Sequence, residues 1–286
     1  MERWEDNMNK KLILAVLYLS GMLLVFLVLG PEQISGKNNT SASVYDSDIN
    51  MKKSISEMQA VIKSMYSDSK YKNVKVVTSY QSFGVLCNNL SQERLKNLWN
   101  TANPTKKVSW VCGIVANTML LRKYMTLASG KLSNSYTAET IFNMEMKYAW
   151  GSGKIFSSED TSGTTQNEEV KLLNYFLDTY ESSKYTANGD ITGLWGTCRN
   201  YLDERIRPII LDLNGNESDH AVLCTACYIE QVTYKTTTLG ITISHTDSYK
   251  IARVCNGWEN STDSGWNNST NSYIFFDCVR DLIKLK

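Results

Sequence analysis

The stretch Asn214-Gly-Asn-Glu-Ser-Asp-His-Ala-Val-Leu-Cys-Thr-Ala-Cys-Tyr228 gives the clearest indication of how this chain folds. A polar loop ends at His220, and the residues after it are mostly apolar, which is typical of a buried strand entered from a loop. His220 is one of only two histidines in the chain. Its place at the mouth of a strand would expose the ring on the rim of a sheet.

Two further elements place reactive groups at their ends. Cys112-Gly113 stands where a loop gives way to an apolar helix, and Asn256-Gly-Trp258 closes a strand-like run. A thiol, an imidazole and an amide in this order fit a cysteine nucleophile with an oriented base. We therefore expect a thiol hydrolase if the three converge. Cys112 would attack, His220 would act as base and then as acid, and Asn256 would orient the ring.

Each of these residues also has an ordinary structural interpretation. Cys112 taken alone fits a buried cysteine on an apolar helix, and Asn256 fits a turn asparagine before glycine. The other histidine, His245, is a weaker candidate for the base. Asp219 and Asp247 are weaker candidates for the orienting group.

Length and composition favour one sizeable domain with accessory segments. The chain has 286 residues, of which 42% are hydrophobic, so a packed core is expected. The formal net charge is +1 and no dense basic patch is present, which argues against a nucleic-acid partner. Helical patterns come first and strand patterns follow, so the sequence predicts an α+β fold with a mostly antiparallel sheet.

The elements follow from hydrophobic spacing and capping residues. Helices are expected over about 51–66, 91–103, 112–125, 138–149, 165–177 and 191–204. Strands are expected over about 74–80, 208–213, 220–230, 231–245, 249–256 and 272–277.

The N-terminal region predicts a membrane anchor. Residues 12–30 carry no charge, and a spanning helix needs about 20 mostly apolar residues. No small-residue cleavage site follows, so an uncleaved anchor is favoured over a removed signal peptide. Lys10 and Lys11 place residues 1–11 in the cytoplasm and the rest outside the cell.

The remaining boundaries divide the part of the chain outside the membrane. Residues 31–50 are rich in Ser, Asn and Gly and fit a flexible linker. Residues 51–103 fit an N-terminal helical segment or a pro-region, and residues 104–286 form the expected catalytic domain.

The chain has seven cysteines, and an oxidising exterior would permit disulfides. One catalytic thiol plus three bridges fits the odd number. The pair Cys224-Thr-Ala-Cys227 is best explained as core packing within a strand. A redox pair or half of a zinc site is less favoured, because the sequence completes neither pattern. No metal or organic cofactor is expected.

Three motifs resemble those of the papain-like cysteine peptidases, most closely the bacterial C39-like and staphopain-like branches. They are Val111-Cys112-Gly113-Ile-Val-Ala-Asn-Thr, Ser218-Asp-His220-Ala-Val-Leu and Val254-Cys-Asn256-Gly-Trp258, and Arg207-Pro-Ile-Ile210 resembles the strand before the histidine loop. The resemblance spans roughly residues 104–278. It implies a two-lobed fold, with Cys112 on a helical lobe and His220 and Asn256 on an antiparallel sheet lobe. It also implies that a peptide or protein substrate is hydrolysed between the lobes through a thioester acyl-enzyme.

Two departures from the family pattern keep other functions open. Lys106 stands where these peptidases carry a glutamine that donates to the oxyanion, and 108 residues separate Cys112 from His220. A catalytically weak or inactive papain-like surface binding module is one alternative. A transglutaminase-like or amidase-like acyltransferase is another. The richness in Lys, Asn and Tyr, with only three prolines, suggests a bacterial source.

Overall fold

The computed structural model describes residues 51–87, 89–127, 136–151, 153, 155–156, 163–180, 185–214, 219–257, 266–267 and 272–286. All of them belong to one compact unit, residues 39–286. The predicted cytoplasmic N-terminus, the membrane span over 12–30 and the linker over 31–50 lie outside the described residues. Within the described residues, no helix combines the length and apolarity needed to cross a membrane.

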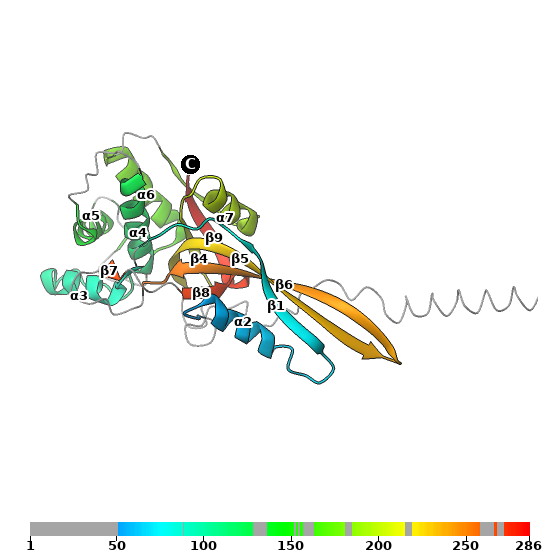
Figure 1. Cartoon of the computed structure of the whole chain (residues 1–286). Helices are drawn as coiled ribbons and strands as arrows, with labels where there is room; N and C mark the ends of the chain where they lie inside the picture. Colours follow the sequence, from blue (N-terminus) through cyan, green and yellow to red (C-terminus); the bar gives the residue numbers. More distant parts are fainter. Residues whose placement is uncertain are drawn as a thin grey trace, which may run out of the picture. The chain divides into compact units, whose positions relative to one another are not determined.

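The helices agree closely with those expected from the sequence (Figure 1). They are α2 (Ile55–Ser64), α3 (Gln92–Ala102), α4 (Cys112–Leu127), α5 (Ala138–Trp150), α6 (Gln166–Tyr180) and α7 (Leu194–Asp203). Ser91 caps α3 by accepting a hydrogen bond from the backbone N–H of Arg94 at 3.2 Å. Thr165 and Glu168 form the expected capping box at the start of α6, because each side chain accepts from the other's backbone N–H.

The strands pair in the antiparallel sense, as predicted, in a main sheet and a separate two-stranded sheet. They are β1 (Lys72–Gln81), β2 (Asn89–Leu90), β3 (Ala187–Asp190), β4 (Ile209–Leu213), β5 (His220–Thr238), β6 (Ile241–Cys255), β7 (Trp266–Asn267), β8 (Ser272–Phe275) and β9 (Val279–Leu285). The main sheet has the order β3-β9-β4-β5-β6-β8, and β1 also pairs with β5. Every strand pair in the described residues is antiparallel. The α+β class is therefore confirmed.

The hairpin of β5 and β6 corrects the expected strand boundaries. The predicted breaks at residues 230–231 and 245–249 are wrong, because β5 continues to Thr238, the chain turns at Leu239-Gly240, and β6 runs unbroken from Ile241 to Cys255. Both turn residues have positive φ, 52° and 78°, as a two-residue hairpin requires. The sequence changes near residue 230 because the strand stops being buried on both faces there. Beyond that point β5 and β6 continue as a long ribbon (Figure 1).

Strand β9 was not expected, and it lies between β3 and β4. The sequence did not predict β9 because it contains charged residues, whereas interior strands are usually continuous runs of apolar residues. Asp281 and Lys284 are nevertheless buried. Each has a partner of opposite charge: Asp281 pairs with Arg280, and Lys284 pairs with Asp190. These pairs allow a charged sequence to form an inner strand.

Helices cover the sheet on two faces where β4 and β5 meet. Ala221 and Leu223 of β5 pack in the hydrophobic cluster that contains the buried residues of α3, α4, α5 and α6. Val222 and Cys224 pack in a second cluster with residues of α7. This alternation defines an α4 face and an α7 face of the sheet.

The segment 51–103 packs onto the same sheet. Strand β1 pairs with β5 from Lys72 opposite Lys235 to Gln81 opposite Tyr228. Helix α2 buries Met58 and Ile62 in a third hydrophobic cluster that includes residues of β5, β6 and β8.

Candidate active site

Cys112 is the first residue of α4 and is partly exposed. The backbone N–H of Ala221 lies close enough to its sulfur to lower the pKa of the thiol. The sulfur therefore lies against the peptide that joins His220 to Ala221. Helix α4 packs along β5, so the fold brings the start of the helix to the start of the strand.

His220 is the first residue of β5, and its side chain is buried. Its ring atom Nε2 lies 2.7 Å from the backbone carbonyl oxygen of Asn256. Because a carbonyl oxygen only accepts hydrogen bonds, Nε2 carries the proton in the neutral ring. The lone pair then belongs to Nδ1, the nitrogen that would act as a base.

Asn256 contacts the ring through its backbone, whereas the sequence predicted a contact through its carboxamide. That carboxamide is fully buried. Its Oδ1 accepts from Asn89 Nδ2 at 3.0 Å, and its Nδ2 donates to Ser272 Oγ at 3.0 Å. Asn89 and Ser272 offer complementary groups to a buried amide, which explains why the amide is engaged with them.

The alternation along β5 determines how the ring and the sulfur approach each other. Ala221 belongs to the α4 face, together with Cys112. His220 is two residues before Val222 and therefore points to the same face, the α7 face. The Cys112 sulfur and the His220 ring thus lie on opposite faces of the sheet at the beginning of β5, with the His220–Ala221 peptide between them.

Burial keeps both groups neutral near pH 7. It raises the pKa of the Cys112 thiol to about 11, although the N–H groups of Ala221 and Gly113 oppose that shift. It lowers the pKa of His220 to about 4. The described geometry therefore holds a thiol and a neutral imidazole rather than a thiolate–imidazolium pair.

Three buried carboxyl groups on the α4 side of the sheet were not predicted. Glu169 comes from α6, Asp212 from β4 and Asp281 from β9. Asp212 pairs in register with both Ala221 and Asp281, so these groups share the α4 face. An aspartate inside the apolar run of β4 was the one signal in the sequence that could have revealed the cluster.

The carboxyl of Glu169 lies directly against the start of α4. A Cβ added at Gly113 would lie 1.8 Å from Glu169 Oε1, so only glycine fits there. Burial raises the pKa of Glu169 to about 8, and it raises the pKa of Asp212 well above its usual value. Glu169 therefore keeps its proton at neutral pH and presents a neutral group near the sulfur.

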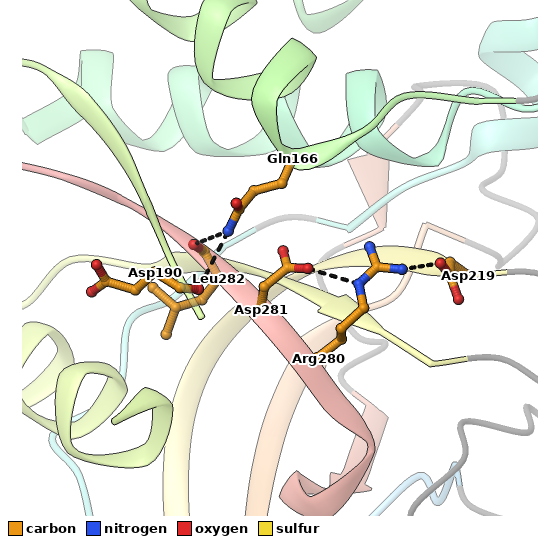
Figure 2. Close-up of polar contacts among 6 residues, drawn as sticks. All are labelled: Gln166, Asp190, Asp219, Arg280, Asp281 and Leu282. Atoms are coloured by element: carbon orange, nitrogen blue, oxygen red, sulfur yellow. Dashed lines mark hydrogen bonds and ion pairs between the residues drawn. The ribbon is translucent and has the colours of Figure 1, made fainter. Parts of the chain in front are cut away.

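Arg280 connects this cluster to the loop that precedes His220. Its Nε donates to Asp281 Oδ2 at 2.7 Å, and its NH1 donates to Asp219, as Figure 2 shows. Asp219, a weaker candidate for the orienting group, is thus paired with Arg280. Gln166 at the start of α6 donates to the backbone oxygens of Leu282 and Asp190, at 3.1 and 3.3 Å (Figure 2). This contact ties the first turn of α6, which also carries Glu169, to β9 and β3.

The other weaker candidates are engaged along the ribbon of β5 and β6. His245 Nε2 lies 2.7 Å from Thr236 Oγ1, and its ring stacks on Tyr234 at 4.9 Å. Asp247 accepts a hydrogen bond from Tyr66. These contacts fit a structural role for both residues.

The loop before Cys112 contains the groups considered as oxyanion donors. The Asn103 amide donates to the backbone oxygen of Trp99 at 3.0 Å and so caps the end of α3. Lys106 and Ser109 are exposed in the same loop. Trp258, which follows Asn256, lies outside the described residues.

No protein-family model, curated protein or solved structure matches this chain. The papain-like resemblance therefore rests on the three motifs quoted above.

Proposed function

We propose that this protein is a membrane-anchored cysteine peptidase of the papain-like type, with its catalytic domain outside the cytoplasm. Cys112 is the nucleophile, His220 is the base, and the backbone carbonyl of Asn256 orients the ring. One observation carries the proposal: α4, which begins at Cys112, packs on β5, which begins at His220, and the His220 ring lies 2.7 Å from the backbone oxygen of Asn256.

The reaction has two stages. The sulfur adds to the carbonyl carbon of the substrate while its proton passes to His220 Nδ1. The carbon–nitrogen bond then breaks, the same proton goes to the leaving amine, and a thioester forms on Cys112. In the second stage His220 takes a proton from water as the water oxygen attacks the thioester. The carbon–sulfur bond then breaks, the proton passes from His220 to the Cys112 sulfur, and the acid product leaves.

Local electrostatics favour proton transfer during attack over a preformed ion pair. The neutral thiol becomes a better nucleophile only as its proton leaves, and Asn256 stabilises the resulting imidazolium by accepting from Nε2–H. The N-terminus of α4 stabilises the developing negative charge. The proposal requires Nδ1 to reach the sulfur in the substrate complex, and such contacts tighten on binding in many enzymes.

The oxyanion of the tetrahedral intermediate needs donors at the start of α4. The backbone N–H of Cys112 supplies the first. Lys106 or Ser109 in the preceding loop would supply a second in place of the family glutamine. A single donor is worth roughly 10²–10³ in turnover, so a poor substitute gives a slow enzyme.

The membrane anchor is a separate part of the proposal. Residues 12–30 would span the cell membrane, with residues 1–11 in the cytoplasm, so the catalytic domain would meet extracellular peptides or proteins.

A papain-like binding module is the second candidate. The neutral thiol–imidazole pair and the alternation that places His220 on the face of the strand opposite to Cys112 favour it. Such a module would keep its biological activity after Cys112→Ala, whereas a peptidase would lose it.

Covalent trapping tests the proposal. The full-length protein in detergent is treated with an epoxide-type thiol inhibitor, and the labelled peptide is identified by mass spectrometry. Labelling should fall on Cys112 and should stop in both Cys112→Ala and His220→Ala. Cys87→Ala is the matched control, because Cys87 is the other partly exposed thiol. Labelling of Cys87 instead, or labelling of Cys112 that is unaffected by His220→Ala, would contradict the proposal.

A further inference from the structure

Three buried thiols meet on the α7 face of the sheet. Cys198 of α7 lies with its sulfur 3.3 Å from that of Cys227 and 3.6 Å from that of Cys224, both on β5. All three sulfurs lie within 4.8 Å of one another, and all three side chains are fully buried. The three bridges suggested by the odd number of cysteines are not present, since all seven cysteines lie in described residues and are free thiols.

A β-bulge brings the two strand cysteines to the same side. Residues three apart on a regular strand point to opposite faces. The register of β5 against β6 shifts between Cys224 and Ala226, and this shift restores Cys227 to the face of Cys224. Cys224 and Cys227 both pack in the hydrophobic cluster that contains Cys198, whereas Ala226 packs in the third cluster, with α2. The third thiol is 26 residues upstream of Cys224, so spacing alone did not reveal the group.

We propose that Cys198, Cys224 and Cys227 form a three-thiolate site for a thiophilic d¹⁰ cation, of the class of Zn²⁺ and Cu⁺. Metal–sulfur bonds of about 2.3 Å place three sulfurs about 4 Å apart around the ion. The observed separations of 3.3 and 3.6 Å need only a small expansion to reach that value. A disulfide would instead need two sulfurs to close to about 2.05 Å and would leave the third thiol unpaired.

The surroundings fit an anionic cluster. Each thiol loses one proton on binding, so three thiolates leave a net negative charge with either ion. The Arg253 guanidinium lies close enough to Cys224 to interact with its charge. Its Nε donates to Thr225 Oγ1 at 3.0 Å and its NH2 donates to the Val85 backbone oxygen at 3.1 Å, so the Arg253 guanidinium is held in place.

The site would hold α7 against the sheet. Among the described residues the chain has no disulfide, and α7 is the helix that covers this face. An ion bound to one sulfur of α7 and two of β5 would cross-link them. It lies on the face opposite to Cys112, so the inference does not rest on the proposed peptidase activity.

The test is metal binding by the full-length protein in detergent, reduced and stripped of metal under anaerobic conditions. One equivalent of Zn²⁺ should remain bound after desalting, and Zn²⁺ should raise the midpoint of thermal unfolding. Cys198→Ser, Cys224→Ser and Cys227→Ser should each abolish both effects. Cys278→Ser is the matched control, because Cys278 is a buried thiol in the same hydrophobic cluster but is not one of the three proposed ligands. It should retain the metal.

A second measurement does not depend on variants that fold. Cd²⁺ titrated into the wild-type protein should give a sulfur-to-metal charge-transfer band that saturates at one equivalent, with the intensity of three thiolates. The proposal is overturned if Zn²⁺ and Cd²⁺ fail to bind, or if folded serine variants keep them. It is also overturned if alkylation of the freshly purified, unreduced protein shows two of the three thiols joined in a disulfide.

Discussion

The backbone N–H of Ala221 lies against the sulfur of Cys112, so the second residue of β5 meets the first residue of α4. The two residues are more than a hundred positions apart in the chain. This contact places a thiol beside the peptide of the buried histidine. It also brings the sulfur to the face of the sheet that carries the buried carboxyls, which makes the site sensitive to pH.

Acidification should destabilise the protein through His220. Its folded pKa of about 4 lies below the ordinary value of 6.5, so the unfolded chain binds a proton in that window and the folded chain does not. The contribution of His220 to the free energy of unfolding therefore falls as pH drops from 6.5 to 4, by about 3 kcal/mol in all. In His220→Gln this loss should disappear, as chemical denaturation at several pH values would show. His245→Gln is the control, because it removes the other histidine and leaves His220 in place.

Glu169 should have the opposite pH dependence. Its folded pKa of about 8 lies above the ordinary value of 4.5, so the folded state holds a proton that the unfolded chain releases. Stability is therefore lost as pH rises through that window, at about 1.4 kcal/mol per pH unit. Glu169→Gln keeps the acceptor for Thr164 and cannot ionise. The free energy of unfolding of Glu169→Gln minus that of wild type should therefore increase as pH rises from 5 to 8. A difference that stays constant across that range would refute the raised pKa of Glu169.

Gly113→Ala tests how tightly the carboxyl packs against α4. The new Cβ would lie 1.8 Å from Glu169 Oε1 and 2.1 Å from Thr164 Oγ1, so both groups must shift inside a closed core. We expect a loss of about 1–3 kcal/mol in the free energy of unfolding. Gly196→Ala in α7 is the control. It meets no atom within 4 Å and should stabilise the helix by about 0.5–1 kcal/mol. Equal effects at the two positions would contradict the described packing.

The sequence predicted the helices better than the strands. Caps and apolar spacing act within a few residues, so Ser91 and the Thr165–Glu168 box marked the starts of α3 and α6 correctly. Strand β9 depends on partners far away in the chain, because its charges are tolerated only through pairs such as Lys284 with Asp190. Strand β3, Ala-Asn-Gly-Asp, has no intrinsic preference for extended structure and forms by pairing with β9.

The candidate site was predicted in part. The motifs placed Cys112, His220 and Asn256 at element ends, as found. The carboxamide of Asn256 was expected on the ring, but Asn89 and Ser272 engage it, and no local pattern encodes those partners. Glu169 was also missed, since it reaches the site only through the packing of α6 on the sheet.

Asn256→Ala should separate the two roles of this residue. It keeps the backbone carbonyl that contacts His220 and removes an amide bonded to Asn89 and Ser272. We expect a loss of about 1–3 kcal/mol in stability, because Asn89 and Ser272 lose a buried partner. The pH profile of Cys112 alkylation should stay unchanged. A shifted profile with unchanged stability would instead assign the orienting role to the side chain.

Peptide hydrolysis tests the central claim most directly. The full-length protein in detergent is incubated with a mixed peptide library, and cleavage products are counted by mass spectrometry for wild type, Cys112→Ala and Cys87→Ala. The account predicts cleavage by wild type and Cys87→Ala and none by a folded Cys112→Ala. Cleavage that persists in Cys112→Ala, or the absence of cleavage by all three proteins, would contradict it.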